Sequence, residues 1–365
     1  MKQMLPNVAH VVISLNCGGL ESLVVKWTNF RSEEGGKTYI ICLDSTGDFA
    51  NKVNPDNVFC VSAKRYKFPW DINAVDRIRQ FVKDKNITVL HSHNLTAMQY
   101  SSLASMCREV HHVYTQHGEN IHHGRVVDKI RKKVFLHFVD RIVAVSESVR
   151  TFMSSQQWVN GNLISVISNG VDINHEITNS SELTEGVLIL GSVGRLAFVK
   201  GWDLFLPVYQ TILKELPSIQ IKLLLVGDGP EREKLEKLVK QLNIRDHVVF
   251  EGMKDNVTDY LEKMDVFLLP SRNEGLSVAL LEAMAMGKPS IVTDVGENRR
   301  VLNNGECGLI LSKGKDSWVE CIVAYLLNTK LLSKHSRLAA RRVKNCYTLQ
   351  QNIESYEHIY LSIFK

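Results

Sequence analysis

The 365-residue sequence contains no apolar run long enough to cross a membrane. A helical span needs about 18 or more consecutive apolar residues. The apolar run at residues 8–15 is interrupted by His10 and is followed at once by Gly18 and Gly19, which is not the pattern of a secretory leader. We therefore expect a cytoplasmic protein.

The sequence also lacks cysteine pairs and a strong excess of one charge. Its seven cysteines are scattered without a Cys-x-x-Cys motif, which argues against a disulfide framework or a zinc ribbon and favours a reducing compartment. The formal net charge is only +5, from 44 basic and 39 acidic residues. A dedicated nucleic-acid binder is more basic, so we expect no nucleic acid as a partner, whereas a phosphate-bearing ligand is compatible with this charge.

The usual patterns of a metal site are missing as well. Histidine is concentrated between residues 91 and 123, and His-x-His spacing can bind zinc, but there is no His-Glu-x-x-His motif and no supporting cluster of cysteine or aspartate. We therefore expect no metal and no cofactor. We expect His93 and His117 to line a cleft between domains instead. The histidines of this stretch are His91, His93, His111, His112, His117, His122 and His123.

Short apolar runs that alternate with amphipathic stretches are abundant along the chain. The runs are nearly continuous in apolar residues, which is typical of strands buried on both faces of a parallel sheet. The alternation predicts an α/β fold with doubly wound parallel sheets. The expected strands are 9–15, 38–43, 57–61, 88–91, 112–115, 141–145, 163–167, 187–193, 220–226, 247–250, 266–269 and 290–293.

A polar segment at residues 172–186 divides this pattern into two halves. It is rich in Ser, Thr, Asn and Glu and has few apolar anchors, so we interpret it as a linker. Hydrophobic residues make up 44% of the chain, which is enough for a core in each half. We expect domains at residues 1–171 and 187–348. Helical patterns end the sequence at 316–327, 331–343 and 349–364.

Residues 271–287 combine a strand end, a loop and a helix start. Ser277 is a good N-cap and Gly287 a typical helix end. Ligands bind at the carboxyl ends of parallel strands, and free helix amides attract phosphate. The amides expected to do so belong to Leu276, Ser277 and Val278.

Two carboxylates, Glu274 and Glu282, flank this turn. Carboxylates accept hydrogen bonds from sugar or ribose hydroxyls. The alternative is that both are solvated loop and helix positions, although the neighbours of Glu282 along the chain are all apolar, which is unusual for a solvated helix position. Two cations, Arg195 and Lys200, follow the strand at 187–193 and could neutralise a diphosphate, or could form a solvated loop pair.

These motifs together resemble the large retaining glycosyltransferase family 4, also called glycosyl transferases group 1, which has the two-domain GT-B fold. The resemblance implies two Rossmann-like domains facing a cleft. The N-terminal domain is the acceptor side, and the C-terminal helix, residues 349–365, is expected to pack with it. The matching segments are residues 18–21, 115–118, 145–148, 169–172, 194–195, 200–201, 226–230, 250–252 and the pair Glu274 and Glu282.

The resemblance also implies a nucleotide-diphosphate sugar as donor and a saccharide or lipid-linked saccharide as acceptor. Catalysis is assigned to His117, Arg195, Lys200 and Glu274. The donor is expected to contact Gly18, Gly19, Arg195, Lys200, Gly252, Met253, Glu274, Gly275, Leu276, Ser277, Val278 and Glu282. The acceptor side is expected to include Glu21, His93 and Glu119.

The chemistry implied by the family is departure of the diphosphate, stabilised by Arg195 and Lys200, with retained configuration. The Asp-x-Asp motif that binds metal in the other major glycosyltransferase fold is absent, so we expect a metal-independent enzyme. Uridine is the expected base and bacterial surface polysaccharide the expected product. A sugar-nucleotide epimerase or hydrolase, and a non-catalytic nucleotide-binding module, are the alternatives. The sequence departs from the family at Glu297, where a second small residue usually follows Gly296.

Residues 125–141 form a basic amphipathic helix pattern. We expect its apolar face to pack on the core, and the alternative is peripheral contact with an anionic membrane at the inner face of the plasma membrane. The apolar positions are Val127, Ile130, Val134 and Phe138, and the charged ones are Lys129, Arg131, Lys132 and Lys133.

Overall fold

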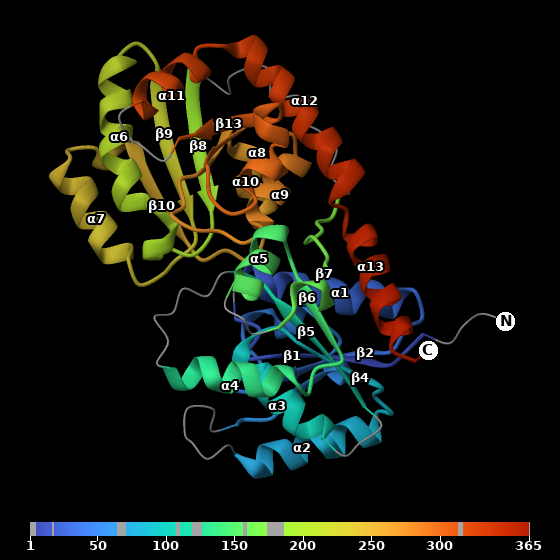
Figure 1. Ribbon diagram of the computed structural model, residues 1–365. Coiled ribbons are helices and arrows are strands. Elements are labelled where there is room, and N and C mark those ends of the chain that lie inside the picture. Colours follow the sequence, from blue (N-terminus) through green and yellow to red (C-terminus); the bar gives the residue numbers. More distant parts are fainter. Residues whose placement is uncertain are drawn as a thin grey trace. The chain divides into compact units, whose positions relative to one another are not determined.

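The computed structural model divides the chain into two compact units, Met1–Asn169 with Gln350–Lys365 and Gly170–Leu349 (Figure 1). It describes residues 5–16, 18–63, 71–106, 110–118, 126–155, 159–173, 186–312 and 317–364. Each unit contains one parallel sheet flanked by helices, which confirms the predicted α/β fold with two Rossmann-like domains. Most of the predicted linker, residues 174–185, lies outside the described residues.

The first unit is built on a seven-stranded sheet in the order β3-β2-β1-β4-β5-β6-β7, with every pairing parallel. Strand order reverses between β1 and β4, which makes their carboxyl ends a topological switch point. All seven strands were predicted, although the first ends at Val12 rather than at residue 15. The strands are β1 (Val8–Val12), β2 (Thr38–Cys42), β3 (Val58–Cys60), β4 (Val89–Ser92), β5 (His111–Gln116), β6 (Arg141–Ala144) and β7 (Ile164–Val166).

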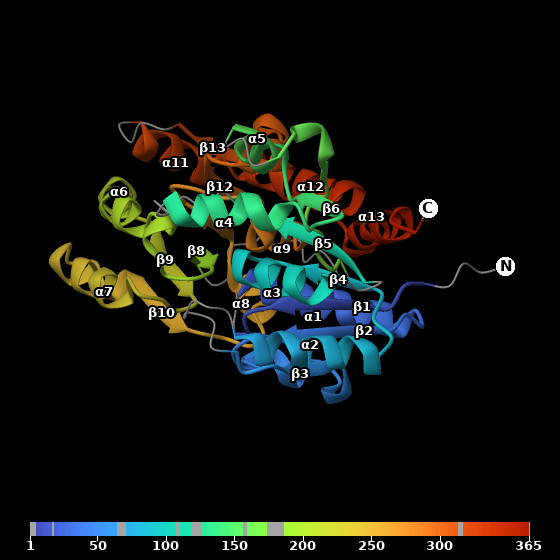
Figure 2. The same ribbon diagram turned by 60° about the horizontal axis from the view of Figure 1, so that its bottom comes forward.

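Successive side chains of β1 point to opposite faces of this sheet. Ala9 and Val11 belong to the apolar core beneath α2 and α3, which lie side by side in both views (Figures 1 and 2). His10 is the register partner of His91 on the other face, where it stacks on Trp27 of α1. The helices of this unit are α1 (Gly19–Glu33), α2 (Ile72–Asp84), α3 (Leu95–Ser105), α4 (Val126–Leu136), α5 (Glu147–Ser155) and α13 (Leu349–Ser362).

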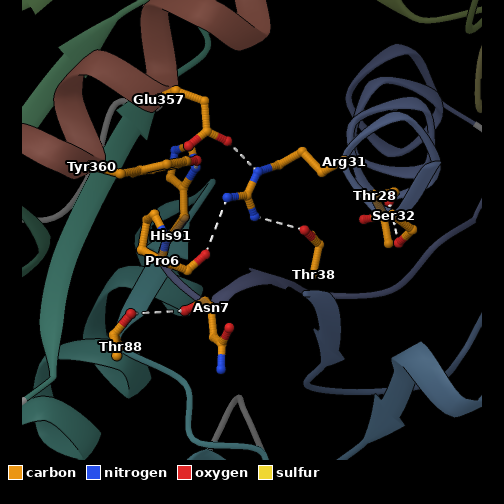
Figure 3. A network of polar contacts seen from close by, with 10 residues as sticks. All are labelled: Pro6, Asn7, Thr28, Arg31, Ser32, Thr38, Thr88, His91, Glu357 and Tyr360. Carbon is orange, nitrogen blue, oxygen red and sulfur yellow. Dashed lines mark hydrogen bonds and ion pairs between the residues drawn. The ribbon is translucent and has the colours of Figure 1, made fainter. Parts of the chain in front are cut away.

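The C-terminal helix α13 is tied to the first unit by polar side chains. Arg31 of α1 forms an ion pair with Glu357 of α13. The same guanidinium donates to the Thr38 hydroxyl (2.7 Å) and to the Pro6 carbonyl (3.1 Å), as Figure 3 shows. Three more hydrogen bonds join Trp27 to Asn352 (2.6 Å), His91 to Tyr360 (2.7 Å) and Thr115 to Tyr356 (3.1 Å).

The second unit contains a six-stranded parallel sheet in the order β10-β9-β8-β11-β12-β13. Its switch point lies between β8 and β11. The strand β13 was not predicted, because its four residues form a short run at the edge of the sheet directly after a glycine-containing loop. The strands are β8 (Val187–Val193), β9 (Gln220–Val226), β10 (Val248–Gly252), β11 (Val266–Leu269), β12 (Ser290–Thr293) and β13 (Gly308–Leu311).

The core of this unit joins β8, β9 and β11 to helices α6 and α11 through leucine, isoleucine and aromatic side chains. The continuous apolar runs seen in the sequence are therefore central strands with both faces covered. The helices are α6 (Trp202–Glu215), α7 (Arg232–Gln241), α8 (Thr258–Lys263), α9 (Val278–Ala285), α10 (Asn298–Val301), α11 (Trp318–Leu326) and α12 (Thr329–Cys346).

Helix α4 differs from its prediction in the face that it buries. Ile130, Val134 and Phe138, expected to pack on the core, are 59%, 50% and 43% exposed. The buried face instead carries Phe135 and Lys132. Lys132 can be buried because its amine donates to the Gln116 side chain at 2.8 Å, and burial lowers its pKa to about 7. No helix in the described part of the chain is long and apolar enough to cross a membrane.

Candidate functional site

Most of the predicted site residues of the second unit lie at the carboxyl edge of its sheet. Arg195 follows β8, and residues 270–275 follow β11, so both belong to the switch point. A small pocket opens at this place. Its lining consists of Ser192, Val193, Gly194, Arg195, Leu196, Lys200, Trp202, Leu225, Val226, Leu269 and Pro270.

Lys200 and Glu274 form one ion pair at this edge. The Lys200 amine donates to Glu274 Oε1 at 2.6 Å, and the Ser271 hydroxyl donates to the same oxygen at 2.6 Å. The side chains of Lys200 and Glu274 are only 21% and 10% exposed, so solvent screens the pair weakly. Lys200, which was assigned to the phosphate, is therefore in direct contact with Glu274, which was assigned to the sugar. No described residue donates to Glu274 Oε2.

Arg195 differs from Lys200 in having an exposed side chain. Within the described ranges its side chain makes no hydrogen bond and no ion pair. A guanidinium that is not committed to a protein carboxylate can bind phosphate oxygens with two parallel N–H groups. The two predicted cations thus contribute differently: Lys200 is fixed in place, and Arg195 is available to an anion.

The position of Lys200 depends on Arg272, for which the sequence alone indicates no structural role. Arg272 donates to both oxygens of Asp203 at 2.6 and 2.7 Å and to the Phe198 carbonyl at 2.8 Å. Its guanidinium also lies 4.0 Å from the centre of the Phe198 ring. The hydrogen bonds from Arg272 hold the pKa of Asp203 below its usual value. Arg272 therefore fixes the short helical turn Phe198–Lys200.

The turn before α9 has the local structure that the sequence predicted. The Ser277 hydroxyl accepts a hydrogen bond from the Leu280 amide at 3.3 Å, which confirms the N-cap. Gly287 follows the end of the helix with a φ of 69°, a left-handed conformation that suits glycine. Because the Ser277 side chain caps the helix, this residue can offer a ligand mainly its backbone. Glu282 is half-buried on the second turn.

Gly296 and Glu297 support this turn from the loop after β12. Gly296 has a φ of 52°, and an added Cβ would overlap the carbonyl oxygen of Glu274. The Glu297 amide donates to the Gly275 carbonyl at 3.2 Å, and its side chain is buried and lies 3.4 Å from Arg300. The unusual Glu297 is therefore part of the support behind Glu274 rather than an exposed ligand contact.

Glycines also set the distance between the ends of β8, β9 and β10. Gly227 has a φ of 127°, and an added Cβ would overlap the carbonyl oxygen of Gly194. The Gly227 amide donates to the Gly252 carbonyl at 2.8 Å. Gly252 ends β10, and the neighbouring Met253 is 48% exposed. Gly252 and Met253, two of the predicted donor-binding residues, thus lie at the same sheet edge as Arg195.

In the first unit, the predicted site residues also follow strand ends. Gly18 is the N-cap residue of α1, Gly19 is exposed, and Glu21 is half-buried in the first turn of that helix. Glu119 lies outside the described residues. His93 comes directly after β4, and His117 directly after β5.

The structure buries His93, which is only 2% exposed. The expected direct contact between His93 and an acceptor does not fit this burial. Its Nδ1 is instead joined to Nε2 of the half-buried His117 at 3.1 Å, and its Nε2 to Nδ1 of His10 at 3.0 Å. Burial lowers the pKa of both His10 and His117 to about 3, so these rings are neutral at ordinary pH.

Comparison with known proteins identifies two families. Residues 17–175 match Glycosyltransferase Family 4, and residues 174–342 match Glycosyl transferases group 1. The chain is 28% identical over 336 residues to N-acetyl-alpha-D-glucosaminyl L-malate synthase of Bacillus anthracis, which covers 86% of each protein. It is 24% identical to the O-antigen biosynthesis glycosyltransferase WclY of Escherichia coli, over 89% of this chain and 95% of that one.

Solved structures show the same fold. Anabaena HepE in complex with UDP superposes with a TM-score of 0.81 at 18% identity, over 98% of this chain and 100% of that chain. At this level of identity the likeness establishes the architecture of two Rossmann-like domains, and the roles of individual residues depend on the geometry above.

Proposed function

This chain belongs to the family 4 glycosyltransferases with the GT-B fold, and on that premise we propose that it transfers a sugar from a UDP-sugar to a saccharide or lipid-linked saccharide in bacterial surface polysaccharide synthesis. The proposal includes retention of configuration and independence from metal. The observation that carries it is the Lys200–Glu274 ion pair beside the exposed Arg195 at the switch point of the second unit.

The donor diphosphate is the ligand for which these cations are arranged. Arg195 binds its oxygens with two N–H groups, and Lys200 adds a point charge that Glu274 and the surrounding turn already hold in place. A fixed positive charge stabilises the negative charge that grows on the departing phosphate without reorganisation. The same charge makes a metal ion unnecessary in this proposal.

Glu274 binds the transferred sugar. One of its oxygens accepts from Lys200 and Ser271, and the other remains available to a sugar hydroxyl. Hydrogen bonds from Lys200 and Ser271 to one of its oxygens make this carboxylate a poorer nucleophile. We therefore favour a step in which the bond between the anomeric carbon and phosphate breaks as the acceptor oxygen bonds to that carbon from the same face. The departing phosphate takes the proton of the acceptor hydroxyl.

The choice of uridine has two kinds of support. HepE, which shares the fold, was solved with UDP. In this chain, Gly252 and Met253 offer a backbone edge with an exposed apolar side chain to a base at the end of β10. Glu282 and the amides before α9 are assigned to the ribose and the phosphates.

The test is UDP release from UDP-sugars by the purified protein, measured in EDTA with and without a panel of saccharide and lipid-linked saccharide acceptors. We expect release that requires the acceptor and persists in EDTA, and an α-linked product from an α-linked donor. Release without any acceptor would indicate a hydrolase, and a changed donor sugar an epimerase. Loss of activity in EDTA would contradict metal independence, and no thermal stabilisation by any nucleoside diphosphate would contradict the donor site.

The exposed apolar face of α4 supports a lipid-linked acceptor. Ile130 and Val134 of α4 and Phe138 in the turn after it are spaced four residues apart and are at least 43% exposed, and Lys133, the neighbour of Val134 in the chain, is exposed as well. Apolar side chains flanked by positive charge enter the interface of an anionic bilayer. We infer that this face contacts the membrane surface peripherally.

Replacing Ile130, Val134 and Phe138 together with serine is expected to abolish flotation with vesicles of anionic phospholipid while leaving transfer to a water-soluble acceptor intact. Leu327→Ser is the control, because Leu327 is also an exposed apolar residue (57%) but belongs to the second unit. Equal flotation of the triple variant and the parent protein would contradict the inferred contact, as would flotation that Leu327→Ser reduces to the same extent.

A further inference from the structure

Four histidines meet on one face of the first sheet. His10 and His91 are register partners on β1 and β4, His93 follows β4, and His117 follows β5. Hydrogen bonds connect three of them in a line, from His10 Nδ1 to His93 Nε2 (3.0 Å) and from His93 Nδ1 to His117 Nε2 (3.1 Å). The line starts in the buried interior and ends at the half-buried ring of His117.

The interior end of this line is held rigidly. His10 stacks on Trp27, with ring centres 5.3 Å apart, and lies 5.1 Å from His91. Both nitrogens of His91 are occupied, Nδ1 by the Tyr360 hydroxyl and Nε2 by the Thr115 hydroxyl, each at 2.7 Å. Trp27 of α1 and His91, which Tyr360 of α13 holds in place, therefore fix the orientation of His10.

All rings of the line are neutral, because burial lowers the pKa of His93 well below its usual value and those of His10 and His117 to about 3. A neutral imidazole carries a proton on one nitrogen and a lone pair on the other. His93 must therefore donate one hydrogen bond and accept the other, so both bonds of the line run in the same direction. Only two arrangements of the protons satisfy this condition.

The nitrogen at the interior end decides between the two arrangements. His10 Nε2 is buried and has no hydrogen-bond partner. If the bonds run from His117 toward His10, this nitrogen carries an unsatisfied N–H. If they run from His10 toward His117, it carries only a lone pair. Buried donors without a partner are rarer in folded proteins than under-used acceptors, so the second arrangement is favoured.

We propose that His10 and His93 are positioning residues that hold His117 in the Nδ1–H tautomer, so that its outer ring nitrogen offers a hydrogen-bond donor to a sugar hydroxyl of the substrate. Which nitrogen of a histidine carries the proton is set by the bond that the other nitrogen makes. No described residue bonds His117 Nδ1. The contact with the sugar rests on the proposed function, whereas the tautomer is a property of the protein alone.

A metal ion is the competing explanation for this cluster. One nitrogen from each of His10, His91 and His93 lies within 4.8 Å of the others. Binding an ion there requires breaking one hydrogen bond of His91 and one of His93, because both nitrogens of each ring are already bonded. The hydrogen bonds of the line and those of His91 together use every ring nitrogen of these three histidines except His10 Nε2, and they therefore account for the arrangement more completely.

The tautomer is measured directly by the nitrogen chemical shifts of 15N-histidine-labelled protein, because protonated and bare ring nitrogens resonate far apart. His117→Gln identifies the His117 signals. We expect a protonated Nδ1 and a bare Nε2 for His117 in the unaltered protein at neutral pH. A protonated Nε2, or a stoichiometric transition metal bound to the purified protein, overturns the proposal whatever the enzyme's activity.

His93→Phe tests the line itself. Phenylalanine keeps an aromatic ring beside Trp27 and removes the hydrogen bond to His117 Nε2, so His117 is no longer held in the Nδ1–H form and is expected to shift toward the Nε2–H form. UDP-sugar binding should weaken roughly tenfold, the value of about one hydrogen bond, while the affinity for UDP alone stays unchanged. His335→Phe is the matched control, since His335 is buried in the second unit and bonds Tyr325. An unchanged His117 tautomer in His93→Phe, or equal weakening of UDP and UDP-sugar, contradicts the positioning role.

Discussion

Replacing Lys200 with methionine is expected to lower kcat/KM for sugar transfer by roughly 100- to 1,000-fold, the usual cost of removing one preorganised charge from a transition state. Lys200 is largely shielded from solvent and donates to Glu274 at 2.6 Å. Methionine fills a similar volume without the charge, so the departing diphosphate loses its fixed cation. The measurement is the initial rate of UDP release at several donor concentrations with acceptor in excess.

Glu274→Ala is the second arm of this experiment and is expected to abolish transfer while the protein stays folded. Because Lys200 and Glu274 form one unit, the double variant should lose little more than Glu274→Ala alone. Lys234→Met is the matched control: Lys234 pairs with Glu231 at 3.0 Å in the same unit, but its side chain is 74% exposed. A Lys200→Met enzyme with the activity of Lys234→Met would refute the role of the pair.

The sequence predicted the parts of this site that depend on neighbours along the chain. The Ser277 cap, the end of α9 at Gly287 and the strand before Arg195 follow from local preferences of the backbone. Contacts between distant segments could not be predicted. Arg272 and Asp203 are separated by 69 positions, and no pattern in a single sequence pairs them.

Two buried polar side chains share one physical origin. In α4, Lys132 belongs to the charged positions of the amphipathic pattern, yet it is buried because Gln116 accepts from its amine, and the apolar positions expected in the core are exposed instead. In β1, His10 interrupts an apolar run, yet it is buried because His93 bonds its ring and Trp27 stacks on it. A polar side chain can occupy the interior once its partners are supplied by other elements, and a hydrophobic pattern does not contain that information.

The same interior polar chemistry joins the C-terminal helix to the histidine face. Tyr356 and Tyr360 of α13 bond Thr115 and His91, and Glu357 lies between them on the helix and pairs with Arg31. Loosening α13 therefore removes the support of His91, against which His10 is packed. The stability of this helix and the orientation of His117 are linked through side chains of the first unit.

Arg31→Met is expected to lower the free energy of unfolding of the first unit by roughly 3–5 kcal/mol, the range for breaking a buried ion pair. Arg31 is 4% exposed, pairs with Glu357, and donates hydrogen bonds to Thr38 and to the Pro6 carbonyl (Figure 3). Its loss leaves the Glu357 carboxylate, 17% exposed and with one oxygen already lacking a partner, as an uncompensated charge. Urea denaturation followed by circular dichroism measures the loss, provided that the transitions of the two units are resolved.

Arg299→Met supplies the control for the Arg31 variant, because Arg299 forms a two-bond pair with Asp294 (2.6 and 3.0 Å) but is exposed, and such pairs add little to stability. The double variant Arg31→Met with Glu357→Leu should recover much of the lost stability, since it removes the stranded carboxylate as well. Equal midpoints for Arg31→Met and Arg299→Met would show that the pair does not hold α13. Recovery by the double variant would show that the cost arises from the buried charge and not from the missing arginine stem.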